Sequence, residues 1–561
     1  MISGRWRLGV VAFLMIGALF ALAACGDDEG GQTPGPGQTP SPAANLAADQ
    51  TFRVNLGGEP TTLDPQIVAF STDLTVVKQL WRGLFYYDGP ELNVVAAAAV
   101  EVPTVDNGGI SADGLTYTIK VRDDLTWSDG IALTANDFEY AIRRLFDPEA
   151  GATGYYYSFY TAIAGAEDAT TGDAPLDQVG VTAIDATTLE IKLAQKLPTL
   201  LTLLALWPAY PVRQDIIEAE GDTWTEAGKL IGNGPFVLSE WAHEDHITLE
   251  ANPNYWGEDK PTLQKIVFSM APEESQELIS YDNDEFDISR IPLPDTARYE
   301  GDAEQLKYAE LTTFAWEFNN TVAPFDNPDV RKAFSAATDR ETYIQSVRGG
   351  VGLAATSWMP PGIPGYDANR GSEWAFNKDK AQQALTDAGF PGGEGLPKVT
   401  LTIAESEAGR LSADFLDQQI NQNLGVDIEI EVLEESTYED RYLASDFQVV
   451  LGGWGADYAD PENWLPQLFG TDAGLNQYKY SNNDVDTIFD EAAVELDNDA
   501  RIALYQQAES IIIDDDMGVA PIFHRTRNWL IKPWLSGMVT TGLDSEVPGD
   551  FFFTKLQILE H

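Results

Sequence analysis

The sequence contains one cysteine, Cys25, among its 561 residues. A disulfide within the chain, a cysteine-based metal site and a cysteine nucleophile are therefore excluded. Histidine is also scarce, with four residues, and only His243 and His246 lie close together. This H-x-x-H pair flanks Glu244 and Asp245, a pattern typical of an exposed polar turn rather than of a metal site. We expect no metal and no cofactor.

Basic residues are few. The 34 Lys and Arg residues stand against 89 Asp and Glu, which gives a formal net charge of −55. Such a charge repels phosphate groups and argues against nucleic acid and anionic lipid surfaces as partners. It would attract cations and ammonium groups, although a solvated acidic coat is the more ordinary explanation. With so many carboxylates, acid pairs close in sequence cannot indicate a glycosidase.

The usual motifs of hydrolases are missing. The sequence contains neither G-x-S-x-G nor H-E-x-x-H, and the stretch Gly221–Lys229 misses the spacing and the final Ser or Thr of a phosphate-binding loop. An enzyme, such as a secreted hydrolase, is therefore the less expected class, and we predict a protein without catalytic activity.

Long apolar runs are absent from residue 25 onward. The closest, Leu197–Leu206, is interrupted by threonines and bounded by Pro198 and Pro208. It is too short to span a membrane, and we expect it to form a core helix.

The N-terminus does carry an apolar run, Leu8–Ala24, which follows Arg5 and Arg7. It predicts a secretory signal peptide over residues 1–24. The run ends in Leu-Ala-Ala-Cys, which resembles the bacterial lipobox and implies a lipidated Cys25 as the first mature residue. An uncleaved membrane anchor is the alternative. Residues 25–50, rich in Gly and Pro, predict a flexible tether. Both readings give an exported protein held at a membrane by its N-terminus.

The rest of the chain alternates strand and helix patterns. Residues 115–121 alternate apolar and polar side chains, as in a strand. Thr134 and Asp137 form a capping-box pattern at the start of a helix that stops at Asp147-Pro148. Further expected elements are helices over 73–85, from Pro328, and over 378–388 with a stop at Gly389, a hairpin over 181–193, and strands over 51–56, 232–241 and 426–432. This alternation predicts an α/β fold.

The stretch Phe447–Pro461 organises these predictions. Its apolar residues alternate over 447–451, which predicts a strand of a mostly buried sheet. Three glycines within 452–455 leave the backbone around Trp454 bare, so another main chain could approach and hydrogen-bond there. Asp457 follows at once and could hold the ammonium of a peptide that runs along the strand. On spacing alone, the alternative is a tight turn in which Asp457 hydrogen-bonds locally.

Seven stretches occur in a defined order along the chain. They are GGEPTTLDP at Gly57, GLTYTIKVRDDLTWSDGIALTANDFEYAIRRL at Gly114, IGNGPFVLSEW at Ile231, ANPNYWG at Ala251, NNTVAPFDNPDVRKAFSAATDRE at Asn319, NKDKAQQALTDAGF at Asn377 and GWGADYADP at Gly453. The ordered set resembles the extracytoplasmic solute-binding proteins of bacterial ABC importers, in the peptide, nickel and opine family (family 5), over residues 51–561. The last stretch is most similar to the oligopeptide-binding branch.

That resemblance implies a role for each residue of the glycine-rich stretch. Asp457, next to Trp454, would bind the α-ammonium of a peptide, and Gly453 and Gly455 would pair with its main chain. One departure concerns the basic residue that some peptide binders use for the ligand carboxylate, because Leu451 stands in its place. Ligand length and the recognition of the ligand C-terminus therefore stay open.

The resemblance also implies contacts from other segments. Gly58 and Glu59 would pair with the ligand main chain from the opposite side of the cleft. Tyr281, Tyr157 and Tyr160 match aromatic positions near the ligand cleft of the family.

The fold implied by the resemblance is a periplasmic-binding-protein type II clam-shell with an extra domain, in which two lobes enclose the ligand. The expected domains are a discontinuous domain I (51–72, 203–308 and 526–561), domain II (73–202) and domain III (309–525). Hinge motion is expected near 308–311 and 525–528.

The leading functional hypothesis is a lipid-anchored, extracytoplasmic protein that captures oligopeptides and delivers them to an ABC permease with its ATPase subunits. A monomer is expected. The alternative keeps the fold and the import role, with an oligosaccharide or another small solute as the ligand.

Overall fold

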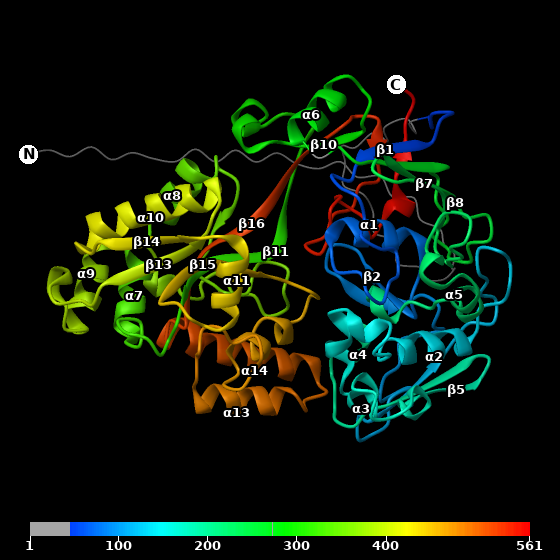
Figure 1. Cartoon of the computed structure of the whole chain (residues 1–561), viewed down its shortest axis with the longest axis horizontal. Coiled ribbons are helices and arrows are strands. Elements are labelled where there is room, and N and C mark those ends of the chain that lie inside the picture. Colours follow the sequence, from blue (N-terminus) through cyan, green and yellow to red (C-terminus); the bar gives the residue numbers. More distant parts are fainter. Residues whose placement is uncertain (1–44, 272) are drawn as a thin grey trace, which may run out of the picture. The chain divides into compact units, whose positions relative to one another are not determined.

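The computed structural model describes residues 45–271 and 273–561. The expected signal peptide, the lipidation site Cys25 and most of the expected tether lie outside the described residues. Leu46–His561 form one compact unit, whose elements are labelled in Figure 1. The expectation of a mixed α/β fold is confirmed.

Two sheets are built from the first half of the described chain. The first is a four-stranded sheet of order β1-β9-β8-β7, and the second is a three-stranded sheet of order β4-β6-β5. Their strands are β1 (Thr51–Asn55), β9 (Lys265–Ser269), β8 (His246–Ala251), β7 (Phe236–Ala242), β4 (Thr116–Lys120), β6 (Thr188–Lys192) and β5 (Val181–Asp185). The hairpin expected over 181–193 is therefore confirmed as β5 and β6, which pair antiparallel.

The third large sheet has the strand order β10-β16-β11-β15-β13-β14, with β12 paired to β16. Its strands are β10 (Ile288–Arg290), β16 (Val519–Ile531), β11 (Gln305–Phe318), β15 (Val449–Gly455), β13 (Val399–Ala404), β14 (Ile428–Leu433) and β12 (Leu353–Ala354). The long strands β11 and β16 pair antiparallel and run through both segments expected to act as hinges, with a register shift between Ala309 and Thr313. Two smaller pairs join β2 (Phe85–Asp88) to β3 (Asn93–Ala96) and β17 (Leu535–Ser536) to β18 (Gln557–Ile558).

Helices complete the unit. The longer ones are α1 (Ser71–Leu80), α2 (Ala135–Arg144), α5 (Gln214–Glu220), α6 (Glu274–Asp282), α7 (Pro328–Ala337), α8 (Arg340–Val347), α9 (Lys378–Asp387), α10 (Glu407–Leu424), α11 (Glu435–Leu443), α13 (Asn483–Ala492) and α14 (Asn498–Glu509). The short ones are α3 (Ala166–Thr170), α4 (Leu200–Leu203) and α12 (Pro466–Phe469).

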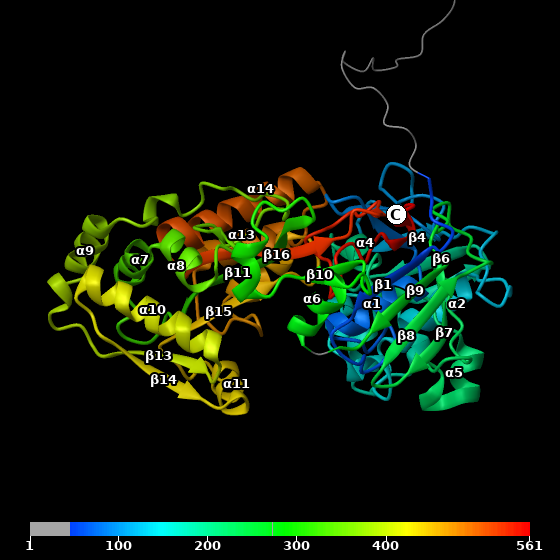
Figure 2. The same ribbon diagram turned by 90° about the horizontal axis from the view of Figure 1, so that it is seen from above.

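Helices α7, α9 and α10 lie beside strands β13, β14 and β15, as Figures 1 and 2 show. Trp316 from β11 and Leu401 from β13 are fully buried against Phe334 of α7 and Leu416 of α10, in a single apolar cluster. One face of the third sheet therefore forms the core of this part of the unit.

Local sequence signals set several helix ends as expected. Thr134 and Asp137 form a capping box at the start of α2, with the Thr134 N–H donating to Asp137 Oδ2 at 2.7 Å. Asn327 caps α7 by accepting from the Asp329 N–H at 2.9 Å. Gly389 follows α9 with φ +94°, a left-handed conformation that glycine adopts without strain.

Two expected helices are shorter in the structure. The helix expected over 73–85 ends at Leu80, because the Leu80 carbonyl accepts from the Gly234 N–H at 2.9 Å. The Asn233 side chain then bonds both main-chain groups of Arg82. Residues distant in sequence thus bond the main-chain groups that a longer helix would use for its own hydrogen bonds. Within Leu197–Leu206 only α4 is helical, although the segment lies in the core as expected; the bounding prolines limit it.

A buried ion pair joins α1 to the C-terminal segment. The Lys78 ammonium lies 2.9 Å from Asp550 Oδ1, and the two side chains are 1% and 0% exposed. Lys78 also donates to Ser545 Oγ at 2.8 Å, and Thr75 Oγ1 donates to Asp550 Oδ2 at 2.8 Å. The carboxylate therefore depends on internal partners alone.

We predict that Lys78→Met lowers the free energy of unfolding by about 3–5 kcal/mol, because Asp550 stays buried without its cation. Urea denaturation measures the loss. Lys307→Met is the control, since it breaks an exposed pair with Glu300 and should cost less than about 1 kcal/mol. Equal losses in the two variants would contradict the prediction.

Candidate ligand-binding site

Strand β15 uses one edge for pairing and leaves most of the other edge bare. Its residues Val449–Gly455 pair antiparallel with Thr312–Phe318 of β11. On the other edge, β13 pairs only with Val449 and Val450. Within the described part of the chain, no strand lies against this edge after Val450.

The direction of the hydrogen bonds decides which residues face the bare edge. The Ala456 N–H donates to the Leu311 carbonyl at 2.8 Å, so Ala456 turns its main chain toward β11. In an antiparallel ladder, neighbouring residues turn these groups to opposite sides. Gly455 and Gly453 therefore present their N–H and C=O groups to the bare edge, where a ligand main chain could pair with them.

Close approach of β11 explains the glycines. A Cβ atom at Gly453 would overlap the Thr313 carbonyl oxygen and lie 3.0 Å from Phe314 Cα. A Cβ atom at Gly455 would meet only Thr312 Oγ1, at 3.2 Å. The two glycines thus face the same edge but differ in the space behind them.

We predict that Gly453→Ala destabilises the protein by about 1–3 kcal/mol, because β15 must shift away from Thr313. Gly455→Ala is the matched control and should cost less than about 1 kcal/mol. Thermal or urea unfolding of both variants checks the difference. A Gly453→Ala protein as stable as the Gly455→Ala protein would contradict the close approach of Thr313 to Gly453.

Asp457 lies at the end of this edge and is partly buried. Asn463, which is fully buried, holds it from two sides: the Asp457 N–H donates to Asn463 Oδ1, and Asn463 Nδ2 donates to Asp457 Oδ2, both at 2.9 Å. Burial raises the pKa of Asp457 to about 6, and the bond from Asn463 offsets only part of this effect. Of the residues described, no Lys, Arg or His forms an ion pair with Asp457. The carboxylate is therefore placed to receive a cation from outside.

Trp454 is also held by Asn463. Its indole Nε1 donates to Asn463 Oδ1 at 3.3 Å, and its ring packs against the core. Asn463 was not among the residues expected from the sequence. The sequence offers one signal for Asn463, its position six residues after Asp457 and just beyond Pro461. That position does not indicate which side chain Asn463 contacts.

A cavity of about 160 Å³ opens next to Asp457. Its lining residues come from several segments: Ser71, Leu74, Tyr156, Trp207, Glu310, Leu311, Thr312, Gly455, Ala456, Asp457, Arg527, Gly542, Leu543, Asp544, Ser545 and Phe551. The Tyr156 ring packs edge-on against Trp207, with centroids 5.1 Å apart. The cavity therefore combines an aromatic wall with an unpaired carboxylate.

The tyrosines expected near the ligand do not line this cavity. Tyr160 is fully buried and donates to the Leu203 carbonyl at 2.7 Å, and Tyr157 packs partly buried against the core. Tyr281 lies on α6, where it donates to Glu304 Oε2 at 2.6 Å. From the run of tyrosines it is Tyr156 that reaches the cavity, because the run forms a short 3-10 helix whose facing residues the sequence does not reveal.

Gly58 and Glu59 follow β1 and do not line the Asp457 cavity either. A Cβ atom at Gly58 would meet no atom within 4 Å, so the space on that side of Gly58 is open. The Glu59 carboxylate accepts from Trp241 Nε1 at 2.8 Å and from the Glu244 N–H at 2.6 Å, and it contacts His243 Nδ1 at 2.8 Å. The side chain of Glu59 is thus held by the end of β7 and by the β7–β8 connection.

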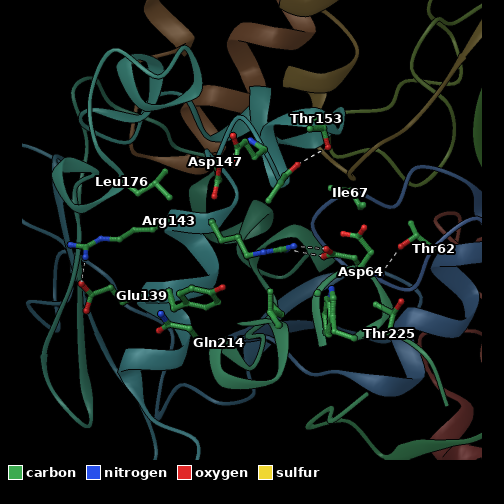
Figure 3. Close-up of a pocket in the computed structure, with 18 of the residues that line it drawn as sticks. Thr62, Asp64, Ile67, Glu139, Arg143, Asp147, Thr153, Leu176, Gln214 and Thr225 are labelled. Carbon is green, nitrogen blue, oxygen red and sulfur yellow. Dashed lines mark hydrogen bonds and ion pairs between the residues drawn. The ribbon is translucent and has the colours of Figure 1, made fainter. Parts of the chain in front are cut away.

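A larger cavity, of about 830 Å³, lies elsewhere, and Figure 3 shows its lining. Its arginines already have carboxylate partners. Arg144 makes two hydrogen bonds to Asp64, at 3.1 and 2.7 Å, and Arg143 pairs with Glu139 at 2.6 Å. None of the residues expected to contact a ligand lines it.

The described residues contain no cluster of three or more His, Cys, Asp or Glu side chains that could hold a metal ion. Among the helices of residues 45–271 and 273–561, none is both long and apolar enough to cross a membrane.

Comparisons with known proteins agree on one family. The family model of bacterial extracellular solute-binding proteins, family 5 Middle, matches residues 98–476. The oligopeptide-binding protein OppA of Bacillus subtilis is 31% identical over 96% of this chain and 97% of its own length. The probable deoxycholate-binding periplasmic protein YgiS of Escherichia coli is 30% identical over 91% and 94%.

A solved structure gives the same result for the fold. The unliganded open form of MppA, a periplasmic murein tripeptide-binding protein, matches with a TM-score of 0.81 and 29% identity over 93% of this chain and 99% of that one. The expected type II binding-protein fold is therefore confirmed.

Proposed function

Because this chain belongs to the bacterial extracellular solute-binding proteins of family 5, we propose that it captures oligopeptides for an ABC importer, with Asp457 as the anchor for the peptide ammonium. The observation that carries the proposal is a partly buried carboxylate without an internal cation at the end of a bare strand edge. Similarity to proteins named for oligopeptide and murein tripeptide binding supports it.

The geometry gives the bound peptide a direction. With its ammonium at Asp457, the peptide runs antiparallel to β15 past Gly455 and Gly453. It then reaches Val450, where Thr402 of β13 occupies the edge. The bare stretch of β15, residues 451–455, therefore faces about five ligand residues. Main-chain pairing reads no side chain, so a broad range of sequences is accepted.

Gly58 and Glu59 supply main-chain contacts from the opposite side when the protein closes around the peptide. The open conformation of the MppA structure that this chain matches supports such a step. The register shift in β11 overlaps one of the two expected hinge segments and provides a place for bending.

The remaining parts of the proposal concern the cellular setting. Residues 1–24 are removed, Cys25 carries the lipid and residues 25–50 tether the binding unit outside the cell membrane. The monomeric, peptide-loaded protein docks on the permease, whose ATPase subunits drive import. We propose no catalytic step, cofactor or metal for this function.

We predict that Asp457→Asn weakens peptide binding by about two to three decades in Kd, since the ligand ammonium loses its ionic partner, a cost of about 3–4 kcal/mol. Isothermal titration calorimetry with ligand-free, refolded protein measures the change. Asp472→Asn, at an exposed position, is the control. Equal wild-type affinity for a peptide and its N-acetylated form would disprove the anchor.

Peptide affinity should also depend on pH. Asp457 must be ionised to bind an ammonium, and in the ligand-free protein its pKa is about 6. We expect Kd to be constant above about pH 7 and to rise about tenfold per pH unit below pH 6. Titrations between pH 4.5 and 8 test this, and Asp457→Asn should lose the slope. A flat wild-type profile would argue against Asp457 as the contact.

A non-peptide solute is the second candidate. Similarity to a protein named for deoxycholate binding and the aromatic wall of Tyr156 and Trp207 favour it. A thermal-shift screen separates the two: a response to bile acids or oligosaccharides, with indifference to peptides, would keep the import role and change the ligand.

A further inference from the structure

The cavity of about 830 Å³ drawn in Figure 3 is lined by segments that lie far apart in sequence. Helix α2 contributes residues three or four positions apart, which lie on one face of the helix: Asn136, Glu139, Tyr140, Arg143 and Arg144. The other lining residues come from the segment after β1, the turns after α2 and before β5, and α5 with the turn that follows it. We call this space the α2–α5 cavity. It shares no lining residue with the cavity next to Asp457.

The α2–α5 cavity has more carboxylates than cations. Arg144 pairs with Asp64 at 2.7 Å, and Arg143 pairs with Glu139 at 2.6 Å. The other carboxylates of the lining make no ion pair within residues 45–271 and 273–561; they are Asp147, Glu149, Asp177 and Asp222. Their charge favours a cation in the cavity. The chain is acidic throughout, so this surplus alone does not distinguish the cavity from the rest of the surface.

A buried hydroxyl does distinguish it. Thr225 is only 8% exposed, and it lines the cavity (Figure 3). Its Oγ1 forms no hydrogen bond within the described part of the chain, although a buried hydroxyl normally has a partner. An ammonium group in the cavity would donate to this oxygen. Thr225 therefore points to a ligand independently of the carboxylates.

Apolar side chains lie among these polar groups and limit the class of ligand. Leu176, Ile217 and Trp224 all line the cavity and belong to the apolar core or pack against it. A bare metal ion would leave their surfaces in water, and the described residues contain no cluster that could hold one. A linear polyamine carries several ammonium groups joined by short aliphatic chains. Its ammonium groups can meet the carboxylates while its methylene groups cover the apolar side chains.

We propose that the α2–α5 cavity is a binding site for a linear polyamine. Asp177 and Asp222 receive its ammonium groups, because neither side chain makes a hydrogen bond or ion pair within the described residues, whereas Asp147 already accepts from the Glu149 N–H at 2.9 Å. Thr225 is the buried acceptor. The site does not depend on the proposed peptide function, since the two cavities have no residue in common.

Isothermal titration calorimetry of the wild-type protein with spermidine, at low ionic strength, tests the site. Spermidine should bind saturably at about one molecule per chain. Butylamine, which has one ammonium group, should bind at least about tenfold more weakly. Binding of spermidine without saturation, or binding of butylamine with the same affinity, would overturn the proposal.

Two double variants separate the cavity from the acidic surface. Asp177→Asn combined with Asp222→Asn should weaken spermidine binding about tenfold. Asp472→Asn combined with Asp490→Asn removes the same charge at exposed positions outside the cavity and should keep the wild-type affinity. Equal losses in the two double variants would show general attraction to the acidic surface and overturn the site.

Thr225→Val tests the buried hydroxyl with little change of shape. The variant should bind spermidine about tenfold more weakly, because a hydrogen bond to a charged group is lost. Its melting temperature without ligand should not fall, since Oγ1 has no internal partner to lose. Wild-type spermidine affinity in Thr225→Val would overturn the assignment of the hydroxyl to the site.

Competition with peptide locates the amine. Spermidine should bind to peptide-saturated protein with the same affinity as to the ligand-free protein. Displacement of spermidine by peptide would place the amine in the cleft beside Asp457 and overturn the second site, while the proposed peptide function would stand. Failure of peptides to bind would overturn the peptide function and leave the test of the two double variants unchanged.

Discussion

The antiparallel pairing of β15 with β11 is the constraint on which the candidate site depends. It occupies one edge of β15 and, through the bond from Ala456 to Leu311, fixes Gly453 and Gly455 with their main-chain groups outward. The same close approach admits no side chain at Gly453. Because β13 stops pairing at Val450, the outward groups stay without a strand partner in the described chain. An open edge of this kind is a template for an added strand.

The carboxylate of Asp457, at the end of this edge, forms no ion pair with a Lys, Arg or His of the described residues. Asp460, another buried acid, pairs with Arg501 at 2.6 Å. Asp457 has only the amide of Asn463, and its pKa rises accordingly. Burying a charge without a partner costs stability. Such a cost is typical of positions where a ligand supplies the missing charge.

Much of the fold follows from local signals in the sequence. Helix caps at Thr134 and Asn327 and the glycine after α9 act within a few residues, so the sequence alone locates these ends. The end of α1 follows from contacts with Gly234, more than 150 positions away, which no local pattern contains. In the candidate site, the glycines and Asp457 could be predicted because their chemistry is readable from residue type and spacing. Asn463 and Tyr156 could not, since their roles come from how short turns orient them.

The sequence by itself determined the α/β class, the family and the presence of a glycine-rich strand that is followed by a carboxylate. Composition, periodicity and ordered motifs are properties of the chain, so they can be read without the structure. Only the tertiary structure decided which edge of β15 is open and which tyrosine reaches the cavity. These depend on contacts between segments far apart in sequence, such as the pairing of β15 with β11. Such contacts form only when the sheet brings those segments together.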